Sequence, residues 1–115
     1  MARAPVPGRP VRGSTTGRPV MAALDMLGRR WALRILWELR QGPVAARELQ
    51  ARCDAMSSSV LYQRLAELSE ARLVRQNESG GYELTTIGAS LAGALDPLDA
   101  WARAWQRDLR RSHGA

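Results

Sequence analysis

The sequence predicts a mainly α-helical domain that contains one small β-hairpin. Three observations lead to this fold class. Apolar residues recur at helical spacing along most of the chain, a middle stretch changes to the short runs typical of strands, and Gly80-Gly81 provides the positive φ of a tight turn between them. A length of 115 residues, 45% of them apolar, suits one modest core.

The charge of the chain indicates a polyanionic partner. The formal net charge is +6, and the 17 lysine-plus-arginine positions are all arginine. Guanidinium groups bind phosphate through a planar fork, so nucleic acid is the first candidate for so small a basic domain. The single cysteine, Cys53, excludes an intrachain disulfide, and no apolar run approaches the ~20 residues of a membrane span. We therefore expect a cytoplasmic protein without a membrane partner.

The composition of residues 1–18 predicts a flexible, disordered basic arm ahead of a folded domain at residues 19–115. Residues 1–19 hold four prolines, three glycines, four arginines and no acidic residue. Such a segment buries too little apolar surface to order itself. Two interpretations are open: a dispensable extension, since Met21 is an alternative start, or an arm that touches DNA phosphate or the minor groove.

Periodicity predicts four helices before the hairpin and one after it. Pro19 suits the first turn of a helix, and Gly28 suits its end. The expected order is helices at about 20–27, 29–42, 45–52 and 57–71, strands at about 73–77 and 82–85, and a long helix at about 86–111. Within this last helix, Pro97 predicts a kink or a break, with Asp96 as the cap of a new segment.

The link at residues 53–56 is short enough to make the third and fourth helices a helix-turn-helix, at about 45–71. The hairpin at about 73–85 follows directly and converts this motif to a winged helix-turn-helix. No single element is specific for this fold, whereas their order is. The sequence therefore predicts a DNA-binding domain whose fourth helix enters the major groove.

The fourth helix has a buried stripe and an opposite polar face. Leu61, Leu65 and Leu68 form the stripe, and the outward face lies roughly 100–200° around the helix from Leu61. On that face, Ser59, Tyr62, Gln63 and Ala66 include no acidic residue. Glutamine can pair with adenine through both of its polar groups, and Arg64 at one side is expected to reach phosphate. An ordinary solvated polar face is the alternative interpretation. The residues predicted to bind DNA are Ser57, Ser58, Ser59, Tyr62, Gln63, Arg64, Arg47 and Arg75, with Ser57 also the helix cap.

The terminal helix carries a narrow apolar seam. From Leu91 to Leu109 its members recur at steps of four and three residues, which is the pattern of a coiled-coil-like contact. Trp101 and Trp105 lie one turn apart on this seam, and with Trp31 they are candidates for a small-molecule pocket between subunits. Core packing is the alternative interpretation of these tryptophans.

Several blocks of the sequence match a known pattern. They are Leu24-x-x-Leu27-Gly28-x-x-Trp31, Ile35-Leu36…Leu39…Gly42-Pro43, Glu48-Leu49, Leu61-x-x-x-Leu65-x-x-Leu68 and Tyr82-x-Leu84-Thr85-x-x-Gly88. From about Pro19 to Trp101 the chain resembles the HxlR-type winged helix-turn-helix transcriptional regulators of bacteria. The resemblance implies a homodimer on an imperfect palindrome, joined through its terminal helices with help from the N-terminal one. The residues expected at the dimer contact are Leu24, Leu91, Leu95, Leu98, Trp101 and Trp105.

Three departures from the family pattern limit what the resemblance implies. Arg18 stands where many members carry a redox-sensing cysteine, which puts that kind of thiol switch in doubt. Ala45-Ala46 replaces the usual Arg-Phe pair after Gly-Pro, which puts a phosphate contact in doubt. Arg72 replaces the glycine usually found before Leu73, and the wing is shorter than usual.

An enzyme is the class that the sequence disfavours. The serines at 57–59 have no histidine base available, since the only histidine, His113, lies in the C-terminal tail, and there is no phosphate loop or Cys/His cluster. We expect no catalytic residues, metal or cofactor. The predicted function is a dimeric, sequence-specific regulator that binds double-stranded DNA. The alternative is a sensor of an unknown small-molecule effector, or a winged-helix protein-interaction module, in which DNA binding is secondary.

Overall fold

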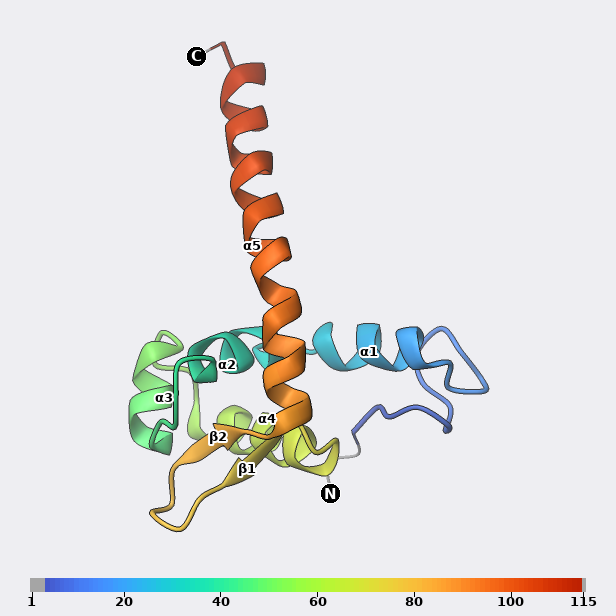
Figure 1. Ribbon diagram of the computed structural model, residues 1–115, viewed down its shortest axis with the longest axis vertical. Coiled ribbons are helices and arrows are strands. Elements are labelled where there is room, and N and C mark those ends of the chain that lie inside the picture. Colours follow the sequence, from blue (N-terminus) through green and yellow to red (C-terminus); the bar gives the residue numbers. More distant parts are fainter. Residues whose placement is uncertain (1–3, 115) are drawn as a thin grey trace.

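The structure, a computed structural model, describes residues 4–114, which form five helices and a two-stranded sheet (Figure 1). The predicted order of elements and the winged helix-turn-helix fold class are confirmed. The elements are α1 (Pro19–Leu27), α2 (Ala32–Leu39), α3 (Ala46–Arg52), α4 (Ser58–Glu70), β1 (Val74–Gln76), β2 (Tyr82–Leu84) and α5 (Thr86–Ser112).

The core lies between α2, α3 and α4. Apolar side chains at helical spacing on these three helices are almost fully buried, as hydrophobic burial of one face of each helix requires. The predicted stripe on α4 is confirmed, with Leu61, Leu65 and Leu68 no more than 1% exposed. The other large members of this core are Ile35, Leu36, Leu39 and Leu49.

The hairpin is fixed to the helical body by a backbone bridge that the sequence did not reveal. β1 and β2 pair antiparallel, with Arg75 opposite Glu83. Outside the hairpin, the N–H of Val44 donates to the carbonyl of Tyr82 at 2.9 Å, and the N–H of Tyr82 donates back at 2.8 Å. The segment between α2 and α3 thus adds a one-residue third strand, which fixes the wing relative to the helix-turn-helix.

The end of α4 explains why a glycine is usual at the position of Arg72. The Leu73 N–H donates to the Leu68 carbonyl at 2.9 Å, and the Arg72 N–H donates to the Ser69 carbonyl at 3.0 Å. These two bonds define a Schellman motif, which needs a left-handed residue after the helix cap. Arg72 adopts that conformation with φ of 63°, so its side chain strains a turn that glycine would form freely.

Of the kink or break expected at Pro97, the break does not occur, and α5 continues through this residue to Ser112. Proline removes one hydrogen bond and frees the carbonyl of Gly93, one turn earlier. Both residues are exposed, so solvent can satisfy that carbonyl and the rest of the helix holds the segment together. Asp96 does not cap a new segment, because α5 is continuous at this point, and its carboxylate lies 3.9 Å from the guanidinium of Arg40.

Residues 4–18 fold against the body, where composition predicted a flexible arm. Ala4 is 2% exposed, and its N–H donates to Glu70 Oε1 at 2.8 Å. The guanidinium of Arg9 donates to the Ala4 carbonyl at 2.7 Å and to Glu70 Oε2 at 3.1 Å. Composition averages over a segment, whereas these few specific bonds hold it in place. The part of the predicted arm at residues 1–3 lies outside the described residues.

Candidate nucleic-acid interface

The start of α4 is built by side-chain hydrogen bonds. Ser57 Oγ accepts the N–H of Val60 at 3.3 Å, which confirms the predicted cap. Ser58 Oγ accepts a hydrogen bond from Gln50 Nε2 at 3.2 Å, and the same amide donates to the Met56 carbonyl at 2.7 Å. Gln50 of α3 therefore fixes the turn and the first residue of α4 together, so the two helices present their surfaces in one fixed relation.

The face of α4 opposite the core is exposed, as its periodicity predicted. Ser59, Tyr62, Gln63 and Ala66 all reach solvent there, and Tyr62 is 53% exposed. Small and hydrogen-bonding groups without a carboxylate make a surface that can approach base edges without repelling phosphate.

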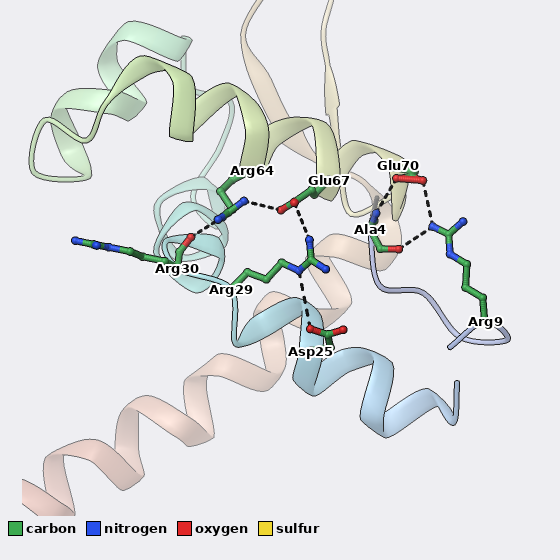
Figure 2. Close-up of polar contacts among 8 residues, drawn as sticks. All are labelled: Ala4, Arg9, Asp25, Arg29, Arg30, Arg64, Glu67 and Glu70. Carbon is green, nitrogen blue, oxygen red and sulfur yellow. Dashed lines mark hydrogen bonds and ion pairs between the residues drawn. The ribbon is translucent and has the colours of Figure 1, made fainter. Parts of the chain in front are cut away.

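Arg64 is not placed for the phosphate contact expected of it. Its Nε donates to the Arg30 carbonyl at 2.8 Å and its Nη1 to Glu67 Oε1 at 3.0 Å, and the side chain is 16% exposed (Figure 2). Arg64 lies beside the buried stripe rather than opposite it, so its guanidinium folds inward onto the body. We therefore assign Arg64 a role in positioning α4.

The two other predicted basic contacts differ in their availability. Arg47 on α3 is exposed, and no side chain in the described part of the protein pairs with it. Arg75 on β1 is 67% exposed, but its Nε lies 2.7 Å from Glu83 Oε2 on β2. A phosphate would have to compete with that carboxylate for Arg75, whereas Arg47 is free to bind one.

A second exposed surface lies on α5, whose C-terminal half projects from the body (Figure 1). Leu98, Trp101 and Trp105 are 48%, 58% and 53% exposed, and the two indole rings stack with centroids 5.3 Å apart. On α1, Leu24 is 58% exposed. Contiguous apolar surface of this kind marks an interaction site.

The remaining predicted contact residues on α5 lie closer to the core. Leu95 is 5% exposed within the single chain, and Leu91 is partly buried against the core. The exposed part of the apolar seam therefore begins at Leu98.

The three tryptophans proposed for a ligand pocket do not come together in one chain. Trp31 packs against the core cluster, whereas Trp101 and Trp105 lie on the projecting half of α5. An apolar cavity of about 480 Å³ exists elsewhere, lined by Val6 near the N-terminus, Met26 on α1 and Leu91 on α5, among others. No local signal in the sequence indicates this cavity, because its walls come from four separate segments: the N-terminal residues, α1, the link after α4, and α5.

Cys53 is fully buried in the turn of the helix-turn-helix. Burial raises the pKa of its thiol, which keeps the thiol protonated and unreactive. The interpretation of Cys53 as a small apolar core residue is confirmed. Within residues 4–114, no three His, Cys, Asp or Glu side chains gather as a metal site would require, and no helix is long and apolar enough to cross a membrane.

A helix-turn-helix with an exposed second helix, followed by a β-hairpin, defines the class of winged-helix DNA-binding proteins. Residues 26–110 match the HxlR-like helix-turn-helix family. The match covers well over half of the chain, which therefore belongs to this family.

The relatives are bacterial transcriptional regulators. The HTH-type regulator YvaP of Bacillus subtilis (strain 168) is 32% identical over 89 residues, which is 72% of this chain and 82% of that protein. The structure of quinone-bound YodB from B. subtilis superposes with a TM-score of 0.69 at 29% identity, covering 74% of this chain and 94% of YodB. A MarR-family regulator from Enterococcus faecalis V583 gives 0.70 at 30% identity, with 80% and 89% covered. The chain is a transcriptional regulator of the helix-turn-helix type.

Proposed function

We propose that the protein is a dimeric, sequence-specific DNA-binding regulator that inserts α4 into the major groove of a palindromic operator in the cytoplasm. The observation that supports this most strongly is the exposed face of the first turns of α4, where Ser59, Tyr62, Gln63 and Ala66 include no acidic residue. The carboxylate further along the same face, Glu70, pairs with Arg9 at 3.1 Å. A helix face meant only for solvation would more often carry carboxylates, which would repel DNA phosphates.

The dimer is supported by the exposed apolar side chains of α5 and by Leu24 on α1. A surface that exposes two stacked indoles and two leucines is stabilised when a partner covers it. A second copy of the chain is the partner because a two-fold dimer presents two identical α4 helices. Successive major grooves on one side of DNA lie ~34 Å apart, so symmetric half-sites would match the protein's symmetry.

The contacts of each subunit divide into reading and positioning groups. Gln63 is exposed on this face and chemically suited to bidentate pairing with adenine, and Tyr62 and Ser59 beside it are suited to bases or phosphates. Arg47 and the backbone at the start of α4 are suited to phosphate. The wing adds a modest contact through Arg75, because Glu83 neutralises part of its charge.

The experiment that tests this assignment replaces Gln63 by alanine. Gln63→Ala should weaken binding to the operator by about 1–3 kcal/mol and relax the preference at one base position, because a bidentate base contact is lost. Fluorescence anisotropy on the operator and on random DNA measures both effects. Gln106→Ala, which removes an exposed glutamine from α5, is the matched control and should change neither. An equal loss on random DNA would show that Gln63 reads no base.

A small-molecule-responsive regulator is the second candidate. The apolar cavity between the N-terminal segment, α1 and α5 favours it, since ligand sites are concave and mostly apolar. YodB has been solved with quinone bound, which shows that a related regulator binds a small molecule. In this chain the buried Cys53 makes reversible, non-covalent binding the expected mode.

A further inference from the structure

Glu67 of α4 is a buried carboxylate held by two arginines (Figure 2). Its side chain is 2% exposed. Arg29 Nη1 lies 2.7 Å from one carboxylate oxygen, and Arg64 Nη1 lies 3.0 Å from the other. Both oxygens are therefore occupied, one by a residue from outside α4 and one by a residue from the preceding turn.

The same two arginines continue the network to α1 and to the link between α1 and α2. Arg29 Nε lies 3.9 Å from Asp25 Oδ1 on α1, and Arg64 Nε donates to the backbone carbonyl of Arg30 at 2.8 Å. Figure 2 shows these contacts side by side between the two helices. Directional, charge-assisted bonds thus join α4 to the residues directly after α1, and the ion pair at 3.9 Å extends the network to Asp25 on α1 itself. These contacts restrict the relative orientation of the two helices.

Stability alone does not account for a buried charge cluster. Removing charges from water carries a desolvation penalty, and apolar residues of similar volume often give an equally stable protein. Buried ion pairs have a better-attested use in fixing one geometry among several that apolar packing would tolerate.

The cluster lies between the two surfaces on which the proposed function rests. Gln63 precedes Glu67 by one turn on α4, and the exposed Leu24 precedes Asp25 on α1. Both surfaces contribute to one groove of about 420 Å³. α4 contributes Gln63 and Glu67, and the α1 side contributes Leu24, Asp25 and Arg29. A shift of α4 at this groove would move the exposed face around Gln63 relative to the exposed apolar side chains expected at the dimer contact.

We propose that Glu67 is a positioning residue for DNA recognition. Through Arg29 and Arg64 it fixes the reading helix relative to α1, and so sets the separation of the two half-sites that one dimer accepts. This inference rests on the proposed function, because it needs a dimer that reads two half-sites. Neither Glu67 nor Arg29 touches DNA in this account.

The test compares operators that differ only in half-site spacing. The probe is a DNA fragment recovered by selection with the wild-type protein, together with versions that have one base pair added or removed at its centre. Wild-type affinity should fall roughly tenfold on either altered spacing. Glu67→Gln, which keeps the shape but removes the charge, should bind the three fragments with affinities within about threefold of each other.

Arg29→Lys is the second variant and keeps the result interpretable if Glu67→Gln does not fold. Lysine retains the positive charge beside Glu67 but lacks the planar fork that also reaches Asp25. We therefore expect the same loss of preference for one half-site spacing. Arg52→Lys is the matched control, because Arg52 pairs with Glu48 at 3.0 Å on the exposed side of α3. This control should keep the wild-type preference for the original half-site spacing. Thermal unfolding checks that each variant is folded.

A merely structural role and the positioning role give different results. If both variants lose affinity by one common factor on all three fragments, Glu67 only stabilises the fold and the inference is overturned. The inference is also overturned if both variants keep the wild-type preference for the original half-site spacing. A wild-type protein that selects no specific fragment would instead refute the proposed function.

Discussion

Helices α4 and α5 both bury one apolar stripe, but their exposed faces carry opposite chemistry. The first turns of α4 expose a tyrosine, a glutamine and small residues, whereas the outer half of α5 exposes leucines and stacked tryptophans. The buried stripes explain why both segments are helical and where each begins to pack. The difference between the exposed faces separates a surface suited to DNA from one suited to a second copy of the chain.

The largest expected effect comes from a charge on the apolar face of α5. Leu98→Glu should raise the dissociation constant of the dimer on the order of 100-fold, because two unpaired carboxylates would enter an apolar interface. Sedimentation velocity at micromolar concentration should then show monomers, and operator binding should fall with dimer loss.

The matched control for this substitution uses the opposite side of the same helix. Ala100→Glu adds the same charge at an exposed position two residues away, which lies roughly 200° around the helix from Leu98. It should leave the dimer intact. A dimer that persists in Leu98→Glu would move the interface elsewhere and remove the proposed contrast between α4 and α5.

A smaller effect is expected at the end of α4. Arg72→Gly should raise the free energy of unfolding by about 0.5–1 kcal/mol, because glycine adopts the left-handed conformation without a side-chain clash. Chemical denaturation measures the change.

Ala71→Gly is the control for that prediction, since Ala71 is right-handed with φ of −76°. It should lower the free energy of unfolding by a similar amount, about 0.5–1 kcal/mol, as glycine does in helical conformation. If both substitutions lower the free energy of unfolding, Arg72 is not strained. At the end of α5 the corresponding left-handed position is occupied by Gly114, with φ of 78°, so the strain of a side chain in this position is found at the end of α4 and not at the end of α5.

The sequence predicted the features that depend on local periodicity. The stripe of Leu61, Leu65 and Leu68, the exposure of Gln63 and the cap at Ser57 all follow from spacing within one helix. The Arg29–Glu67 pair, 38 residues apart, and the Ala4–Glu70 hydrogen bond, 66 residues apart, leave no such signal. The inward partners of Arg64 left no signal for the same reason, because the helical angle places a side chain around the helix axis but does not identify its distant partner.

The continuous course of α5 through Pro97 shows a second limit of local reasoning. Proline is a strong signal for interruption, but its effect depends on whether the freed carbonyl meets solvent. The exposure of Gly93 becomes known only once the helix is placed against the rest of the fold.

The measurement that tests the central claim most directly is selection of bound fragments from the source genome with the purified full-length protein. The recovered sequences should share an imperfect palindrome whose half-site centres lie about 10 base pairs apart, one turn of DNA. That result would establish sequence-specific binding and two-fold symmetry together. Fragments without a common sequence, or with a single half-site and no symmetry, would contradict the account of a dimer reading DNA through α4.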